Sequence, residues 1–388
     1  MRVLLAFDKF KDALSAREAC EIAGHALGER NPGWSFDVCP LADGGEGFGE
    51  ILTAAAGGET RRYSVTGPRG LPVEAAVGLV PLTHIPSRAR QFLGLENEAA
   101  AGGVGRRVAL IEMASASGLA LLAPQERDPW RASTVGTGQL IRHALEEDVA
   151  LILLGVGGSA THDLGLGALG ELGLEFHAAD GQRVHPPTPE HWPRIARLAG
   201  RIPARAPIRI ACDVTNPLLG ARGAAATYGP QKGLRATDLA RLEHASGRLG
   251  LLLCHHCQQP DSLMDTPGAG AAGGIAFGLM AAAGAQLLPG FDLVSAWLDL
   301  DRRVSAADIV ITGEGRFDDS SLSGKGPGAV AARALALGKR AHVFAGAVCA
   351  ASSHDGLTLH AVTPAGTPLD RALRETSLNL RRAVLNAF

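Results

Sequence analysis

Short apolar runs alternate with helical patterns at the N-terminal end of the chain. Residues 3–7 form an uninterrupted apolar run, which predicts a buried strand, and Ser15 with Glu18 forms a capping box that predicts a helix to about residue 30. A second predicted strand over 35–41 leads into a Gly-rich turn and a helix to about Ala56. The pattern indicates successive strand–helix units, the arrangement from which parallel sheets are built.

The same alternation returns near the C-terminus. Strands are predicted at 308–312 and 341–345, and helices at 327–337 and 369–386. Neither end has enough units for a complete doubly wound sheet, so we expect both ends to share one sheet. The predicted fold class is therefore α/β, with two domains: a Rossmann-like parallel-sheet domain built from residues 1–68 plus 287–388, and an inserted α/β domain over 69–286.

The middle of the chain has a different pattern. Predicted strands at 60–66 and 73–80 follow each other without a helix, which places a domain boundary near residue 68. Two further apolar runs, 149–154 and 208–211, each lead into a polar loop that contains glycine or proline. Residues 81–107 show no periodicity and predict a surface loop insertion.

An uncharged stretch over 267–289 is long enough to raise the question of a membrane span. It consists mostly of Gly and Ala, which favours a buried, closely packed helix.

Composition narrows the functional classes. Hydrophobic residues make up 46% of the 388 residues, which is typical of a globular protein with a substantial core. Lys+Arg total 37 against Asp+Glu 39, so there is no global field to attract nucleic acid or an anionic membrane, and any anionic ligand must be held locally. The six cysteines lack the spacing of a disulfide framework, and the apolar run of residues 3–7 is too short and too soon followed by charges to be read as a signal peptide. We therefore expect a cytoplasmic protein, and we expect its ligands to be small molecules.

Five apolar runs each deliver the chain into a loop with Gly, Asp or both. In open α/β sheets, ligands bind beyond the carboxyl ends of the strands, where loop N–H groups can hold anions. The repetition predicts a binding site built from these loops. They are residues 7–11, 43–47, 155–163, 212–217 and 312–319.

The residue types in and near these loops suit phosphoryl transfer. Gly157, Gly158, Ser159 and Thr161 offer backbone and hydroxyl donors to an anion. Phosphoryl transfer also needs cations, carboxylates for Mg²⁺ and a base near the attacking hydroxyl. Two lysines in Gly/Pro-bounded loops, Lys232 and Lys325, are candidate cations. The candidate carboxylates are Asp43, Glu46, Asp163, Asp213, Glu314 and Asp318.

Three other motifs carry weaker functional signals. Gly268 to Gly273 matches G-x-G-x-x-G, but two prolines and scattered polar residues precede it where a dinucleotide site needs a buried strand. Gly324-Lys325 lacks the earlier glycine of a P-loop, so ATP would bind outside that class. Residues 254–257, Cys-His-His-Cys, have no second Cys/His pair and are interpreted as the end of a helix.

Taken in order, the motifs resemble the type-1 glycerate kinase family. The resemblance runs from Asp8-Lys9-Phe10-Lys11 and residues 42–47, through 157–161, 212–217, 229–233 and 268–274, to Ile311-Thr312-Gly313-Glu314-Gly315-Arg316. It implies a two-domain α/β architecture with a discontinuous first domain, and it implies ATP, Mg²⁺ and D-glycerate, with 2-phosphoglycerate as product. The chain departs from the family pattern at four positions, namely Phe7, Lys9, His162 and Ser320, where Pro, Ser, Asn and Gln are usual.

The working hypothesis is an ATP-dependent glycerate kinase that binds its substrates between the two domains. Asp43 or Asp163 orients or deprotonates the hydroxyl, and Lys11 and Lys325 complete the predicted catalytic set. Predicted substrate and phosphate contacts are Lys9, Glu46, Gly157, Gly158, Ser159, Thr161, Asn216, Gln231, Lys232 and Arg316. Predicted Mg²⁺ ligands are Asp213, Glu314 and Asp318.

Two alternatives stay open at this point. One is an NAD-dependent dehydrogenase of a small hydroxy acid, and the other is a non-catalytic carboxylate-binding protein. The residues also leave open whether C2 or C3 of glycerate would be phosphorylated.

Overall fold

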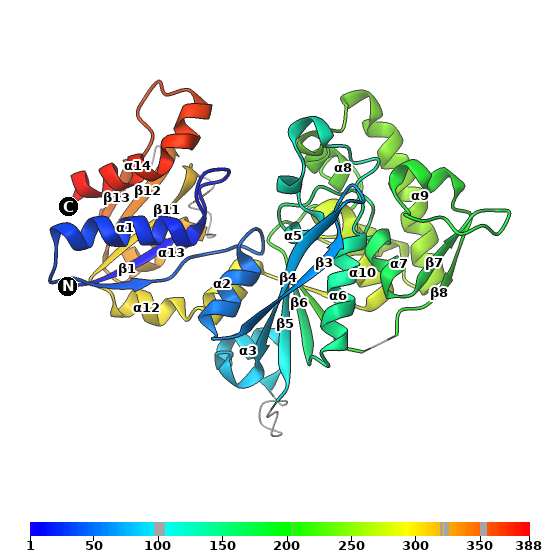
Figure 1. Ribbon diagram of the computed structural model, residues 1–388, viewed down its shortest axis with the longest axis horizontal. Helices are drawn as coiled ribbons and strands as arrows, with labels where there is room; N and C mark the ends of the chain where they lie inside the picture. The colour runs from blue at the N-terminus through cyan, green and yellow to red at the C-terminus, as the bar shows by residue number, and fades with distance from the viewer. Residues whose placement is uncertain (97–104, 204, 319–320, 322–325, 350–354) are drawn as a thin grey trace. The chain divides into compact units, whose positions relative to one another are not determined.

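The chain folds into two compact units, which are described separately. The computed structural model describes all residues except 97–104, 204, 319–320, 322–325 and 350–354. The first unit joins Met1–Asp43 with Val294–Phe388, and the second is Gly44–Leu293 (Figure 1).

The first unit is built on a parallel sheet of five strands in the order β13-β12-β11-β1-β2. Its strands are β1 (Arg2–Phe7), β2 (Ser35–Val38), β11 (Ile309–Phe317), β12 (Arg340–Val348) and β13 (Leu357–Ala361). The N-terminal strand β1 lies between β2 and the C-terminal strand β11, so both chain ends share one sheet, as predicted. The strand order reverses between β1 and β11, and in open α/β sheets the crevice at such a switch point is where ligands bind.

Helices α1 and α14 pack against each other and against this sheet (Figure 1). The helices of this unit are α1 (Ala16–Arg30), α12 (Leu300–Ala306), α13 (Gly326–Ala336) and α14 (Leu369–Ala387). The predicted capping box of α1 is confirmed: the Ser15 amide donates to Glu18 Oε2 at 2.8 Å, and the Glu18 amide donates to Ser15 Oγ at 3.2 Å. The apolar residues of β1, β11 and α1 form one buried cluster.

The second unit contains a mixed sheet of six strands in the order β10-β9-β6-β5-β4-β3. Its strands are β3 (Glu59–Thr66), β4 (Pro72–Pro81), β5 (Arg107–Glu112), β6 (Leu151–Gly155), β9 (Ile208–Ala211) and β10 (Gln286–Leu288), and a separate pair is β7 (Leu174–His177) with β8 (Arg197–Gly200). Strands β3, β4 and β5 pair antiparallel, whereas β5, β6, β9 and β10 pair parallel. The α/β character predicted for the middle region is therefore present.

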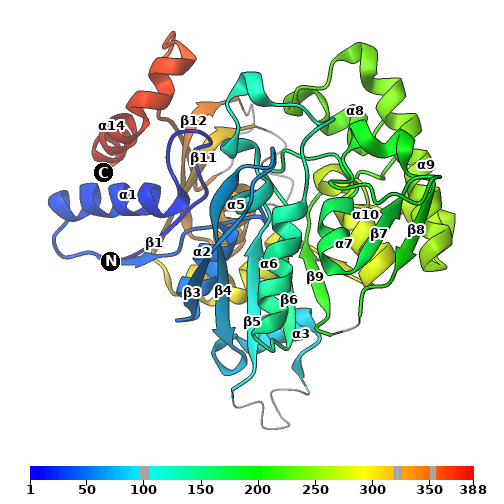
Figure 2. The ribbon, with the colours of Figure 1, turned by 45° about the vertical axis from the view of Figure 1, so that its right-hand side comes forward.

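Helix α6 packs against β3, β4 and β5 and against α7, in front of the sheet in the view of Figure 2. The helices of this unit are α2 (Phe48–Ala55), α3 (Ser87–Leu93), α5 (Ala114–Ser117), α6 (Val135–Glu146), α7 (Leu166–Leu172), α8 (Ala224–Tyr228), α9 (Leu239–Cys257) and α10 (Ala271–Ala283). Helix α11 (Gly290–Trp297) crosses the division between the units. Short 3₁₀ turns are η1 (Leu82–His84), η2 (Leu119–Leu121), η3 (Pro124–Glu126), η4 (Pro189–Arg194), η5 (Pro230–Lys232), η6 (Ala236–Asp238) and η7 (Asp261–Asp265).

The divisions between the units differ from those that the sequence predicted. They lie at Asp43/Gly44 and Leu293/Val294 rather than near residues 68 and 287. Strand β3 pairs with β4, and β4 pairs with β5, so residues 59–66 belong to the second sheet. Strand β10 pairs with β9 and keeps the chain in that sheet to residue 288.

Two segments of uncertain pattern have a defined structure. Residues 81–107, predicted as a loop insertion, contain α3, whose Ala89 and Leu93 are buried. The prediction of a loop was therefore wrong for residues 87–93. Residues 97–104 lie outside the described residues. The uncharged stretch over 267–289 contains the mostly buried helix α10. No described helix is both long and apolar enough to cross a membrane.

Candidate functional site

A pocket of about 840 Å³ lies in the first unit beyond the carboxyl ends of its strands. Charged residues line the part formed by β1, β11 and the segment after β2: Asp8, Lys9, Lys11, Asp43, Glu314 and Arg316. Small and apolar residues line the part formed by β12, β13 and α14, among them Ala347, Val348, Pro364, Ala365, Leu369 and Leu373. One pocket therefore combines a charged region at the β1/β11 switch point with an apolar wall.

The carboxyl groups in this pocket disfavour one another's charge. Burial raises the pKa of Asp8 to about 6, with Lys9 opposing the shift and Asp43 adding to it. Burial also raises the pKa of Glu314 to about 7, and the charges of Asp8, Asp318 and Asp43 add to that shift. Glu314 Oε1 is buried with no hydrogen-bond partner among the described residues. A bound cation would stabilise these carboxylates.

Basic groups lie among the same residues. Lys9 Nζ is 3.8 Å from Asp43 Oδ1, and the Lys9 amide donates to Asp8 Oδ1 at 2.7 Å. Arg316 Nε is 3.3 Å from Asp318 Oδ2. The first unit thus brings together six predicted site residues: Lys9, Lys11, Asp43, Glu314 and Arg316 line the pocket, and Asp318 pairs with Arg316. Two further residues of interest, Ser320 and Lys325, lie outside the described residues.

The second unit contains a buried polar cluster at the loop that follows β6. Lys232 is 1% exposed, and its Nζ donates to Ser159 Oγ at 2.8 Å and to the Thr161 carbonyl at 2.7 Å. Burial lowers the pKa of Lys232 to about 7, against the opposing charge of Asp163. Thr161 is fully buried, and its Oγ1 has no hydrogen-bond partner among the described residues. The predicted anion-binding residues Ser159 and Lys232 are therefore in contact.

Glycines let two of the predicted loops pack against each other. The Gly157 amide donates to the Gly44 carbonyl at 3.1 Å, and a Cβ on Gly157 would lie 2.5 Å from Gly45 Cα. A Cβ on Gly44, whose φ is +91°, would lie 2.8 Å from the Ala211 carbonyl oxygen. Any side chain at these positions would force the loops apart, so these glycines are needed for close approach as well as for their backbone conformation.

Asp163 has a structural set of contacts. Its side chain is fully buried and accepts four hydrogen bonds, from Thr134 N and Oγ1 and from the amides of Gly165 and Gly167, at 2.8 to 3.2 Å. Burial raises its pKa, and these hydrogen bonds oppose the shift. The carboxylate joins the first turns of α6 and α7, which favours a structural role over that of the base.

Two of the other predicted residues of the second unit contact neighbouring segments of the fold, and two are exposed. Asp213 accepts from the amides of Gly290 and Phe291, at 3.1 and 2.9 Å, at the first residues of α11. Asn216 Nδ2 donates to the Arg222 carbonyl at 2.7 Å, and its Oδ1 accepts from Tyr228. Glu46 and Gln231 are exposed.

The predicted metal ligands are divided between the units, because Asp213 belongs to the second and Glu314 and Asp318 to the first. Within the described part of the chain, no three His, Cys, Asp or Glu side chains are grouped as a ready-made metal site.

His162 stands where the family that the sequence resembles usually has asparagine. It is fully buried, its Nε2 lies 3.1 Å from Ser246 Oγ, and burial lowers its pKa to about 3, with Lys232 adding to the shift. The side chain is therefore neutral near pH 7, which removes it as an ionic phosphate contact.

The glycine fingerprint is a packing element. The turn η7, not a strand, precedes it, and Gly273 and Gly274 have φ values of +71° and +89°. A Cβ on Gly273 would lie 2.1 Å from the Thr161 carbonyl oxygen. This arrangement lacks the strand that a dinucleotide site requires. The Cys254 to Cys257 segment ends α9, as predicted.

Comparison with known proteins identifies the family. The model of the "Glycerate kinase family" matches residues 3–388. The chain belongs to the glycerate kinase family.

Among similar proteins of this family, a glycerate kinase of Halalkalibacterium halodurans is 33% identical over 99% of this chain and 96% of its own length. A glycerate 2-kinase of Escherichia coli K12 is 36% identical over 85% of this chain and 81% of its own length. A crystal structure from Salmonella typhimurium LT2, described as a glycerate kinase 2, has a TM-score of 0.75 and 35% identity, and covers 100% of this chain and 97% of its own.

Two parts of the candidate site were not among the predicted site residues. Asp8 lies in a loop that the sequence marked, but only its burial next to Asp43 distinguishes it from an ordinary turn residue. The apolar wall of Leu369 and Leu373 depends on where α14 packs, which no local motif records. Strand β13, which delivers the chain to this wall, was also not predicted.

Proposed function

We propose that this chain is a glycerate 2-kinase that transfers the terminal phosphoryl group of ATP to D-glycerate in the presence of Mg²⁺, giving 2-phosphoglycerate. Membership of the glycerate kinase family and the 36% identity to the Escherichia coli glycerate 2-kinase support this activity. The structural observation that carries the proposal is the pocket of the first unit, in which lysines and carboxylates adjoin an apolar wall.

A nucleotide has the chemistry that this pocket requires. Its volume of about 840 Å³ lies in the range of pockets for cofactor-sized ligands. A purine base would pack on the wall of Leu369 and Leu373, and the phosphates would extend toward Lys9 and Lys11. Leu369 is 74% exposed although it is a large apolar side chain, and a bound base would cover it.

The carboxylates of the same pocket fit Mg²⁺. We place Asp8 and Glu314 as its candidate ligands, because their raised pKa values and the unpartnered Glu314 Oε1 favour a bound cation. Mg²⁺ is commonly held by one or two carboxylates together with substrate phosphates, so a group of three protein ligands is not needed. When bound, the ion would neutralise charge on the phosphates.

Asp43 is the better candidate for the residue that orients or deprotonates the attacking hydroxyl. Its side chain is 50% exposed in the pocket, next to Lys9 Nζ. Asp163, by contrast, has no exposure and accepts four hydrogen bonds. Lys9, whose Nζ is 3.8 Å from Asp43 Oδ1, would also attract an anionic substrate.

The test combines product analysis with a matched pair of variants. Phosphorus NMR of the reaction of ATP and D-glycerate should show 2-phosphoglycerate and ADP. Leu369→Asp should raise the KM for ATP about tenfold or more, because the bound base would have to cover an unpaired carboxylate. Leu378→Asp is the control, since Leu378 lies on the same helix, is 46% exposed and does not line the pocket.

Absence of ADP formation in the wild type would refute the proposed function. Tight glycerate binding without turnover would instead support a carboxylate-binding protein. An active enzyme with the same KM for ATP in both leucine variants would remove the nucleotide from this wall.

A further inference from the structure

Lys232 extends from a rigid turn into the interior of the second unit. The turn η5 ends at Lys232 and is followed by Gly233, whose φ is +92° and whose Cβ, if present, would lie 2.2 Å from the Arg127 carbonyl oxygen. The Lys232 amide donates to the Gly229 carbonyl at 3.0 Å. These contacts fix the backbone from which the lysine side chain begins.

The ammonium group of Lys232 is committed to the protein. It is 1% exposed, and two of its three N–H donors go to the Thr161 carbonyl and to Ser159 Oγ. A substrate could not reach such a group without unfolding its surroundings. The sequence alone predicts that Lys232 contacts a phosphate directly. In the structure, Lys232 is instead placed to support Ser159, which could contact the ligand.

Ser159 is left with an unused donor. A hydroxyl has one proton to donate and two lone pairs that accept, and Ser159 Oγ accepts from Lys232. Its proton has no acceptor among the described residues, and the amides of Gly158 and Ser159 also have none there. A hydroxyl that accepts a hydrogen bond in a buried site is polarised by it and becomes a better donor in turn.

We propose that Lys232 is a positioning residue that holds the Ser159 hydroxyl, beside the free amides of Gly158 and Ser159, so that these three donors bind an oxyanion of a substrate. The inference rests on the proposed function, in which the oxyanion is the carboxylate of glycerate or a phosphate of ATP. Gly158 is exposed and Ser159 is 7% exposed, whereas Lys232 is 1% exposed, so the loop lies nearer the surface than the lysine that supports it.

A double-mutant cycle tests the coupling of the two residues. Ser159→Ala and Lys232→Met should each lower kcat/KM about tenfold to a hundredfold, and the KM that rises, for glycerate or for ATP, identifies the substrate. The kcat/KM of the double variant should be no more than about twofold below that of the less active single variant, because both changes remove the same positioned donor. Additive losses would overturn the inference.

Lys339→Met is the control for a purely structural lysine. Lys339 Nζ also donates to two backbone carbonyls, those of Ser305 and Ala307, but it is remote from the Ser159 loop in the chain and lies in the first unit. Its loss should lower Tm and leave kcat/KM unchanged. If Lys232→Met does not fold, Ser159→Ala alone decides, and full activity of that variant would overturn the inference.

A binding measurement separates this inference from the proposed function. If the wild type forms no ADP with glycerate, the proposed function fails, but inorganic phosphate can still be used as an oxyanion probe. Phosphate should raise the Tm of the wild type and should do so much less in Ser159→Ala. Equal shifts in both proteins would overturn the inference.

Discussion

The buried carboxyl groups of the two units differ in how completely they are hydrogen-bonded. In the pocket of the first unit, Asp8 and Glu314 have raised pKa values, and one oxygen of Glu314 has no partner among the described residues. In the second unit, Asp163 is more deeply buried, but each of its oxygens accepts hydrogen bonds. Burial alone therefore does not separate Glu314 from Asp163; the unused hydrogen-bonding capacity of Glu314 does.

This difference predicts opposite consequences of mutation. Removing a satisfied buried group leaves its former donors unpaired and destabilises the fold. Removing a group that is held in an unfavourable state damages ligand binding and leaves the free protein as stable as before, or more so.

The largest expected effect is on stability in the second unit. Asp163→Ala should lower the free energy of unfolding by about 4 kcal/mol, because four donors lose their acceptor in a site without water access. Urea denaturation followed by circular dichroism measures this. Asp180→Ala, which removes an exposed acceptor of the Gln182 amide, should cost less than about 1 kcal/mol. Equal losses in the two variants would contradict the structural role of Asp163.

In the first unit, Glu314→Gln should act on function. We expect kcat/KM for ATP to fall about a hundredfold, while Tm at about pH 8 stays the same or rises. The folded-state pKa of Glu314 is raised, so its stabilising contribution is present at low pH and is lost as pH rises through about 7. The amide removes that cost of ionisation.

Glu375→Gln on α14 is the matched control, since Glu375 pairs only with Arg371, one turn away, among the interactions that are described for it. Glu375→Gln should change neither kcat/KM for ATP nor Tm appreciably. Normal turnover and a lower Tm in Glu314→Gln would show that Glu314 has a structural role and not a functional one.

Lys232 gives a test with a pH signature. Its folded-state pKa is lowered from 10.5 to about 7, so between these values the unfolded chain binds more protons and stability rises with pH. The wild type should gain stability relative to Lys232→Met as pH rises from about 7 to 10, by at most about 1.4 kcal/mol per pH unit. Urea midpoints at several pH values measure the difference, and Lys339→Met serves as the reference. A pH-independent difference would mean that the amine is not buried as a titrating group.

The sequence predicted those parts of the fold that depend on local patterns. The capping box of α1 follows from the spacing of Ser15 and Glu18, and the pairing of β1 with a C-terminal strand follows from the economy of one shared sheet. The division at residue 43 was missed because nothing local to residues 59–66 indicates which sheet they join. Pairing of β3 with β4 decides it, and that is a tertiary contact.

For the site, the sequence identified the loops but could not assign their side chains. The motifs that contain Asp43, Asp163 and Asp213 are equally rich in polar residues, yet they differ in hydrogen-bond partners that come from distant segments. Gly273 illustrates the same limit: its motif suggests a nucleotide, whereas the nearby Thr161 carbonyl oxygen explains the glycine as packing. Contacts of this kind are set by the fold as a whole.

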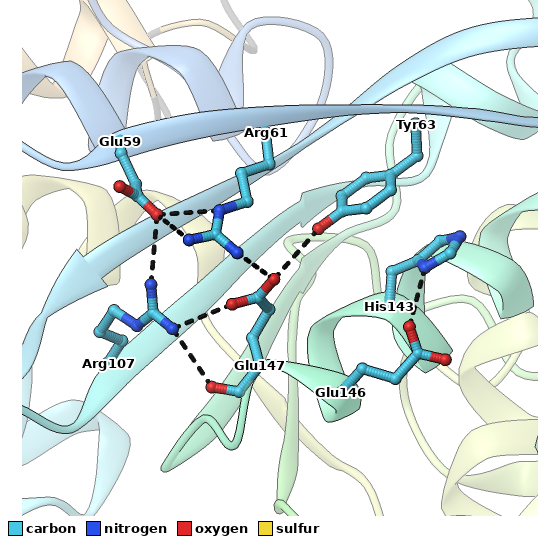
Figure 3. A network of polar contacts seen from close by, with 7 residues as sticks. All are labelled: Glu59, Arg61, Tyr63, Arg107, His143, Glu146 and Glu147. Carbon is cyan, nitrogen blue, oxygen red and sulfur yellow. Dashed lines mark hydrogen bonds and ion pairs between the residues drawn. The ribbon is translucent and has the colours of Figure 1, made fainter.

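The smallest expected effect comes from charges at the surface of the second unit. Glu147, at the end of α6, joins Arg61 of β3 and Arg107 of β5, and Glu59 contacts both arginines (Figure 3). The Glu147 side chain is 17% exposed, but Arg61 and Glu59 are 43% and 54% exposed, so solvent reaches the network. Ion pairs near the surface contribute little and are screened by salt, so Glu147→Gln should lower Tm by only about 2 °C, and in about 1 M NaCl the difference should vanish. The loss in Asp163→Ala should persist in the same salt, because hydrogen bonds in a dry interior are not screened. Glu147→Gln could instead destabilise the protein as much as Asp163→Ala, or its effect could be equally insensitive to salt. The Glu147 network would then behave like a buried group, and unused hydrogen-bonding capacity would not be enough to separate carboxylates such as Glu314 from carboxylates such as Asp163.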